Sequence, residues 1–151
     1  MVLRDKVEIK SSPERVWSYI SDPGQARKWN GGIRAIVPIS AGEWTAGSRW
    51  RVRFEFHGRE SNYLAEALEF EKPLRLVVHM TGGDMPVNGY MQEIYDLSPS
   101  EKGTILRYTI AFSGSGLNLL SAWAKFLSHH LFRPRSKRYL LKLKKLAEDN
   151  G

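Results

Sequence analysis

The feature that most constrains this chain is a change in its hydrophobic period, because side chains repeat every two residues in a strand and every 3.6 residues in a helix. Between residues 33 and 113, apolar and polar residues alternate in about six short runs separated by turn residues. The clearest run covers residues 48–57, where apolar side chains occupy every second position. The connections are short, around Gly58 and Gly82 for example. This pattern predicts a meandering antiparallel sheet.

The residues before the sheet predict a strand and two short helices. Residues 6–10 alternate like a short strand. Ser12 then has the residue type of an N-cap, and Pro13 suits the first helical position, so a helix is expected from Pro13 to about Asp22. Asp22 and the proline after it repeat this signal and predict a second short helix that continues through Trp29.

The last 35 residues return to a helical period with one interruption. Apolar residues cover more than half of the predicted helix circumference between residues 117 and 132. Pro134 removes a backbone donor and crowds the preceding turn, so the helix is expected to kink or restart there. If the helix continued unbroken, the apolar residues after Pro134 would lie on the side that carries the polar residues before it. This change of face independently predicts a break.

Length and composition indicate one domain over residues 1–151, because a chain of this length can bury a sizeable core. The sequence has no cysteine, which excludes disulfides, cysteine-bound metals and a thiol nucleophile. Charged residues near the start do not fit a secretory signal, and no apolar run approaches the roughly 20 residues of a membrane span. We therefore expect a cytoplasmic protein, either monomeric or homodimeric.

The net charge of +7 is concentrated in the last third of the chain. Residues 1–101 hold 13 basic and 14 acidic residues, whereas residues 102–151 hold 10 basic and 2 acidic residues, a balance of +8. Such asymmetry is typical of a surface for anionic lipid, nucleic acid or an acidic partner. A solvated helix face that keeps the protein soluble is the simpler alternative.

Several segments resemble the START-like, or SRPBCC, helix-grip superfamily. Residues 7–17, with the Asp-Pro pair at 22–23, are similar to the N-terminal segment of its members. Residues 69–77 resemble the junction at which its members have a glutamate and a proline followed by a hydrophobic strand. Residues 97–104 are similar to its last hairpin. The chain is closest to the polyketide cyclase/dehydrase and lipid-transport branch. The resemblance implies an α+β fold in which a curved antiparallel sheet of about seven strands wraps around a long C-terminal helix. It also implies a cavity for a small hydrophobic molecule, while the activity stays open because fold does not determine function.

The inward-facing positions of this fold form the candidate ligand site, with ordinary core packing as the alternative for each. Ala65 and Ala67 share the parity of Tyr63 and leave room for a hollow, but the same parity also carries Glu69, so which face of this strand points inward stays open. The predicted lining residues on the strands are Trp50, Phe54, Tyr63, Glu93, Tyr95, Tyr108 and Phe112, and those on the C-terminal helix are Leu120, Trp123 and Leu127.

Glu93 is the candidate catalytic residue. Matching Tyr95 and Leu97 to inward positions of the superfamily places Glu93 inside as well. A carboxylate in an apolar cavity must be paired, neutralised or functional. We therefore expect a partner group within hydrogen-bonding reach, and a role for Glu93 as ligand anchor or acid–base residue is the alternative to simple pairing.

Other sites have little support. The adjacent histidines 129 and 130 point about 100° apart on a helix, so no metal site is expected. No motif for a cofactor or a nucleic acid is present. The aromatic residues beside the basic segment favour contact with an anionic membrane, with Arg133, Arg135 and Arg138 as the predicted contact residues.

Three functions therefore remain open. The first is binding or transport of a lipid or polyketide-like molecule in the cavity. The second is a cyclase or dehydratase that uses Glu93 as an acid or base. The third is a regulatory or partner-binding domain with a filled core. An apolar void above about 300 Å³ would suit the first two.

Overall fold

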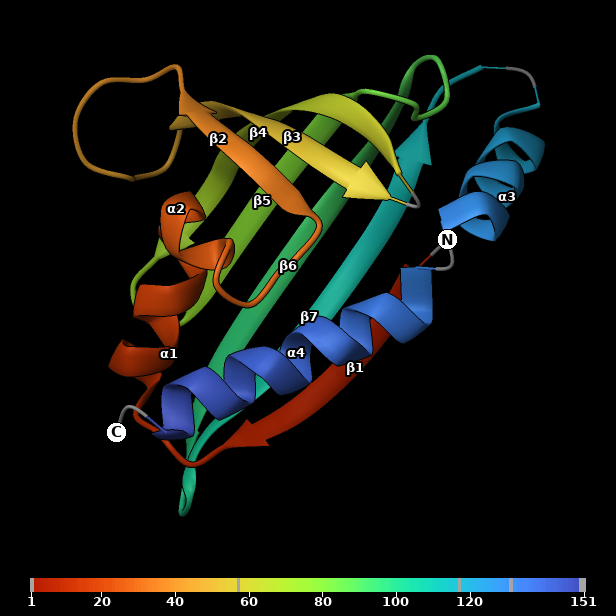
Figure 1. Ribbon diagram of the computed structural model, residues 1–151. Coiled ribbons are helices and arrows are strands. Elements are labelled where there is room, and N and C mark those ends of the chain that lie inside the picture. The colour runs from red at the N-terminus through yellow and green to blue at the C-terminus, as the bar shows by residue number, and fades with distance from the viewer. Residues whose placement is uncertain (1, 57, 117, 131, 150–151) are drawn as a thin grey trace.

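Seven strands form one antiparallel sheet in the computed structural model, which describes residues 2–56, 58–116, 118–130 and 132–149, without the side chains of residues 56, 128–130 and 132–135 (Figure 1). The spatial order is β1-β7-β6-β5-β4-β3-β2, so successive strands from β2 to β7 are neighbours and β1 pairs with β7. The strands are β1 (Val2–Ile9), β2 (Ile33–Pro38), β3 (Arg49–Phe56), β4 (Arg59–Glu71), β5 (Arg75–Gly82), β6 (Gly89–Ser100) and β7 (Gly103–Gly114). The predicted meander of about seven strands is confirmed.

A bulge in β4 determines which side chains of this strand face the core, a question that the residue alternation left open. Ala67 pairs with Val78 and Glu69 pairs with Val77, so Leu68 is an extra residue on β4. A bulge of this kind shifts the alternation by one residue. Tyr63, Ala65 and Ala67 are therefore buried, whereas Glu69 faces outward and binds Arg75 at 2.5 Å.

Two short helices follow β1, as predicted. In α1 (Pro13–Ile20), the Ser12 hydroxyl accepts a hydrogen bond from the Arg15 amide. The second helix, α2 (Pro23–Ala26), begins after its Asp22 cap but stops three residues before the predicted end at Trp29. The reason is that the amides of Lys28 and Trp29 bond to carbonyls only three residues earlier, which continues the chain as turns.

The C-terminal helix is divided into α3 (Leu119–His130) and α4 (Phe132–Asp149). Residue 131, which separates the two, lies outside the described residues, and Pro134 is the third residue of α4. That proline belongs to the first turn of α4, where its missing N–H has no helical partner to lose. Figure 1 shows α4 along the concave side of the sheet near β1, and α3 beside the C-terminal end of β7.

Polar contacts hold the end of α4 against the first strand and helix. The Glu148 carboxylate accepts from the Lys10 amide at 2.7 Å and from Lys144 Nζ at 2.6 Å. Arg15 Nε donates to the Ala147 carbonyl at 2.9 Å. These contacts fix the helix that faces the concave side of the sheet. Among the helices that the structure describes, none has the length and apolar character needed to span a bilayer.

Candidate functional site

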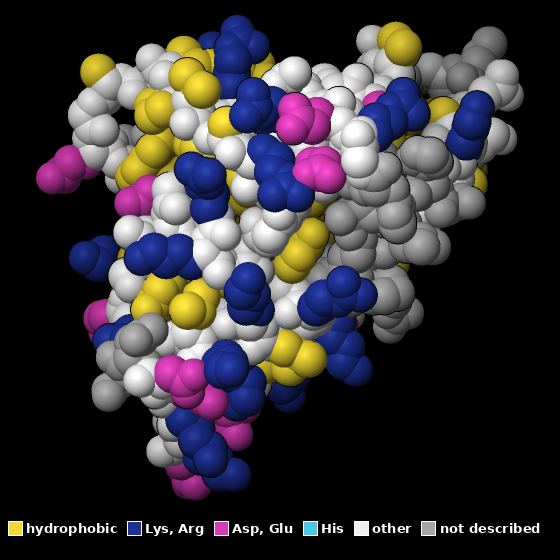
Figure 2. Space-filling view, viewed as in Figure 1, with side chains coloured by type: hydrophobic (Ala, Val, Ile, Leu, Met, Phe, Trp, Pro, Cys, Tyr) yellow, Lys and Arg dark blue, Asp and Glu magenta, His cyan; other side chains and the backbone are white. Residues whose placement is uncertain are grey.

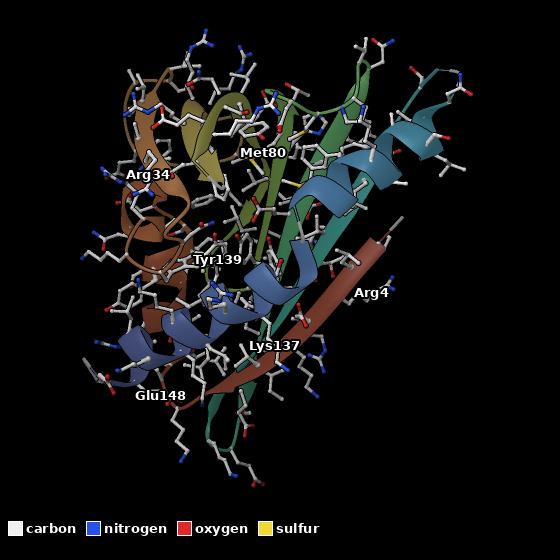
Figure 3. All side chains as sticks on the ribbon, turned by 45° about the vertical axis from the view of Figure 1, so that its right-hand side comes forward. Arg4, Arg34, Met80, Lys137, Tyr139 and Glu148 are labelled. Carbon is white, nitrogen blue, oxygen red and sulfur yellow. The ribbon has the colours of Figure 1, made fainter. Side chains whose placement is uncertain are left out.

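A cavity of about 130 Å³ lies between the concave face of the sheet and α4. Met80 of β5 and Tyr139 of α4 belong to its walls (Figure 3). The segment from α2 to β2, with Trp29 and Ile33, and Phe126 of α3 complete them. Most of the lining is apolar, and Glu93 is the one acidic or basic side chain among the described lining residues.

The size of this cavity restricts what it can hold. It is smaller than the roughly 300 Å³ at which drug-sized ligand pockets begin. It is close to an apolar cavity of about 150 Å³ that binds benzene in another protein. The interior is therefore not filled, and in this conformation it has room for a ligand of about one ring.

Six of the predicted lining residues meet at this cavity, and all six come from the sheet. They lie on four strands, because the alternation of each strand directs every second side chain to the concave face. They are Trp50, Phe54, Tyr63, Glu93, Tyr95 and Tyr108.

The other four predicted residues lie outside the cavity wall. Phe112 and Trp123 pack on each other, with ring centroids 4.9 Å apart, and so extend the core beyond the cavity. Leu127 is half-buried against the core, and Leu120 is 75% exposed. Both lie on α3, which stands beside the C-terminal end of β7, whereas α4 lies opposite the concave face of the sheet (Figure 1).

Several wall residues were not predicted as such. Met80 lies on the inward face of β5, so strand parity offered a signal for it, and Met91 lies on the inward face of β6, as the superfamily match that placed Glu93 inside also implied. Tyr139 lines the cavity from α4, and its place there depends on how that helix packs on the sheet, which the sequence pattern does not determine. Trp29 lines the cavity from a turn, and its indole N–H donates to the Tyr19 carbonyl at 3.0 Å.

Glu93 forms a hydrogen-bonded cluster with two tyrosines of the same wall. Tyr95 and Tyr108 face each other across β6 and β7, with ring centroids 5.0 Å apart. Tyr95 Oη donates to Glu93 Oε2 at 2.8 Å, and Tyr108 Oη donates to the same oxygen at 2.6 Å. The expected partner groups are therefore present, and each is the type of donor that a buried carboxylate requires.

The environment of this cluster raises all three pKa values. Burial raises the pKa of Glu93 because it disfavours the charged carboxylate, and the two tyrosine hydrogen bonds act in the opposite direction. Burial, followed by the nearby Glu93 charge, raises the pKa of Tyr95 and of Tyr108. Both hydroxyls thus keep their protons and remain donors to Glu93.

A second tyrosine contact lies at the rim of the cavity. The Tyr63 hydroxyl donates to an Asp84 carboxylate oxygen, which joins β4 to the loop between β5 and β6. Burial, with this hydrogen bond, raises the pKa of Tyr63. The Tyr63 ring covers Gly83, where an added Cβ would overlap it. Met85, two residues further on, lines the cavity, as Tyr63 does.

The predicted membrane-contact residues are only partly visible. Arg138 is exposed on α4, whereas the side chains of Arg133 and Arg135 lie outside the described residues. Lys and Arg side chains occur along the face formed by α4 and β1 (Figure 2). Within the described residues, no group of three acidic or histidine side chains could hold a metal ion.

Comparison with known structures gives the fold a clear set of neighbours. Protein TTHA0849 from Thermus thermophilus superposes with a TM-score of 0.76 at 16% identity, covering 100% of this chain and 99% of that one. Ara h 8.0201 gives 0.73 at 12% identity, covering 99% of each chain. The Aha1 dimer structure from Colwellia psychrerythraea gives 0.62 at 18% identity, covering 98% of this chain and 96% of that one. At these identities the similarity shows the fold alone.

Comparison of the sequence with family models and with curated proteins gave different results. No curated protein matched. The model of the family described as polyketide cyclase / dehydrase and lipid transport matches residues 2–148, nearly the whole chain. Together with the helix-grip architecture, this match confirms the resemblance seen in the sequence. The chain belongs to the polyketide cyclase / dehydrase and lipid transport family of the START-like, or SRPBCC, superfamily.

Proposed function

We propose that the protein binds a small hydrophobic molecule in the cavity between the sheet and α4. In this conformation the cavity holds about one ring, so a lipid or polyketide-like ligand requires it to widen. The observation that carries the proposal is the cavity itself, which is mostly apolar and contains one carboxylate in its wall. A cavity of this composition gains from apolar contact and uses a few polar groups to orient the ligand. The family description, which includes lipid transport, supports the same function.

The first test is native mass spectrometry of the protein purified from its own host. A retained lipid or polyketide would identify the ligand class. A second test uses benzene as a probe of cavity size. Met80, Met85 and Met91 all line the cavity, so benzene should shift the NMR signals of their ¹³C-labelled methyl groups.

A pair of adjacent substitutions provides the control. Ala67 is 2% exposed and lines the cavity, so Ala67→Leu should reduce its volume and weaken benzene binding. Leu68 is the outward-facing bulge residue, so Leu68→Phe should leave binding unchanged. Absence of both a retained molecule and any methyl shift would rule out the proposal.

A specific observation supports a second function, an enzyme of the cyclase or dehydratase type. Glu93 is an ionisable group on the wall of an apolar cavity, and burial raises its pKa toward the range useful for proton transfer. Glu93→Gln should abolish turnover if the residue acts as acid or base. In a carrier the same substitution should change the affinity by no more than about tenfold, which is about 1.4 kcal/mol.

We also propose that the protein contacts anionic membranes peripherally through α4 and β1. Lys137, Arg138 and Lys142 are exposed on α4, and Arg4 and Lys6 are exposed on the neighbouring edge strand. Arg4 and Lys137 mark these two elements in Figure 3. A carrier of an apolar molecule must exchange it with a membrane or a partner, and clustered cations attract anionic lipid.

A further inference from the structure

Both tyrosine hydroxyls of the cluster donate their hydrogen bonds to the same carboxylate oxygen of Glu93. Tyr95 and Tyr108 both donate to Oε2, at 2.8 and 2.6 Å. A phenol hydroxyl carries a single proton, so neither tyrosine keeps one for a ligand while these bonds are present. Each phenol oxygen can still accept a hydrogen bond.

The second carboxylate oxygen, Oε1, is in a different situation. Among the described residues it receives no hydrogen bond, and it is not one of the buried atoms that lack a partner. It therefore keeps accessible surface, and because Glu93 lines the cavity, that surface faces the cavity. An ionised carboxylate oxygen can only accept. With both tyrosine protons engaged, the cluster offers acceptors and no free donor.

We infer that Glu93, Tyr95 and Tyr108 form a subsite for a ligand hydroxyl, an alcohol or a phenol that donates to Glu93 Oε1. The inference rests on the proposed function and adds the chemical class of the ligand. A carbonyl on the same carbon skeleton would place its oxygen lone pairs against the carboxylate. Because nothing in the cluster would donate to that carbonyl, a buried polar group would be left unpaired, and such unpaired groups give strong discrimination.

Protonation of Glu93 should reverse this preference. Oε2 already accepts two hydrogen bonds, so an added proton belongs on Oε1, where it points to the cavity and can donate to a carbonyl. The other titratable groups among the described lining residues are Tyr63 of β4 and Tyr139 of α4. Burial, with the hydrogen bond to Asp84, raises the pKa of Tyr63, so that hydroxyl keeps its proton, and we attribute the change in preference to Glu93.

The test compares cyclohexanol with cyclohexanone, which share one ring and differ only in the polar group. Binding is measured by titration of the Met80, Met85 and Met91 methyl signals at several pH values, from about 4.3, the ordinary pKa of a glutamate, up to about 10. Cyclohexanol should bind at least about tenfold more tightly than cyclohexanone at the alkaline end. That preference should decline as the pH falls and Glu93 becomes protonated.

The Glu93→Gln variant provides a distinctive control. Its carbonyl oxygen can accept from both tyrosines, which leaves the amide NH₂ as a donor toward the cavity. The variant should therefore prefer cyclohexanone at every pH. Leu68→Phe, which changes an outward-facing residue, should keep the wild-type preference.

Each other outcome has a definite meaning. Equal binding of the two probes at all pH values, or the same preference in wild type and Glu93→Gln, would overturn the hydroxyl subsite and leave the cavity function intact. Failure of both probes and of benzene to shift any methionine methyl would overturn the proposed function, and this inference with it. If Glu93→Gln does not fold, the pH series on the wild-type protein decides.

Discussion

Glu93 and Glu148 are carboxyls whose pKa values move in opposite directions for different physical reasons. Glu93 lies in the cavity wall, where burial disfavours its charge and raises its pKa. Glu148 lies near the surface and accepts hydrogen bonds from the Lys10 amide and then from Lys144, which lower its pKa. The two residues should therefore give the folding stability opposite dependences on pH.

The raised pKa of Glu93 means that the folded protein holds this proton more tightly than the unfolded chain does. Stability should then fall as the pH rises from the unfolded value, about 4.3, toward the folded pKa. Glu93→Gln mimics the protonated state and has no such loss. The melting temperature of the variant relative to wild type should rise with pH over this window, and a difference that is constant with pH would contradict the prediction.

The lowered pKa of Glu148 has the reverse consequence. The ionised carboxylate stabilises the folded state at pH values above about 4.3, and this contribution is lost as the pH falls through the folded pKa. Glu148→Gln should lower the melting temperature at about pH 7 and have much less effect at about pH 3. Glu14→Gln, at an exposed acid of α1, is a suitable control. An equal effect of Glu148→Gln at both pH values would exclude the charge-dependent contact as its cause.

At the scale of elements, α3 should depend on Trp123 for its attachment. Trp123 is 2% exposed and packs edge-on against Phe126 and on Phe112. Replacing it with alanine leaves a cavity, so Trp123→Ala should reduce the free energy of unfolding by about 3–5 kcal/mol. Leu120 lies on the same helix and is 75% exposed, so Leu120→Ala should cost less than about 0.5 kcal/mol. Urea denaturation of both variants measures the difference, and similar losses would show that α3 is not held by Trp123.

The sequence predicted the elements well because their signals are local. Alternation over 48–57 and the caps at Ser12 and Asp22 depend only on neighbouring residues, and the structure contains each of them. The site was predicted where one strand face determined it, as for Glu93 and Tyr95. Leu120 was misplaced because the sequence pattern does not determine how α3 lies relative to the sheet, and Leu120 is on the exposed side of that helix.

The bulge at Leu68 was hidden for a related reason. One extra residue on β4 reverses the faces that follow it, and it is visible only in the pairing with β5. Without it, parity placed the charged Glu69 beside the small residues Ala65 and Ala67. The cavity is thus a product of pairing between strands as well as of residue type.

For the molecule as a whole, the exposed basic residues of α4 lie beside those of the edge strand β1, which packs along it (Figure 2). Each such residue near an anionic membrane contributes roughly 1 kcal/mol at most, and salt weakens the attraction by shortening the Debye length. Lys137, Arg138 and Lys142 are exposed, whereas the contacts that hold the end of α4 come from Lys144, Ala147 and Glu148. We expect joint replacement of the three exposed residues by glutamate to leave the fold intact.

Cosedimentation with vesicles tests the membrane proposal for this face. The wild-type protein should bind phosphatidylserine-containing vesicles more tightly than neutral vesicles, and added salt should reduce the difference. Lys137→Glu, Arg138→Glu and Lys142→Glu together should abolish it. A control with the same change in net charge replaces Arg27, Arg51 and Lys102, which are exposed on other elements. If both triple variants lose binding equally, total charge and not this face is responsible, and equal binding of the wild type to anionic and neutral vesicles would leave the basic residues as a solvated surface.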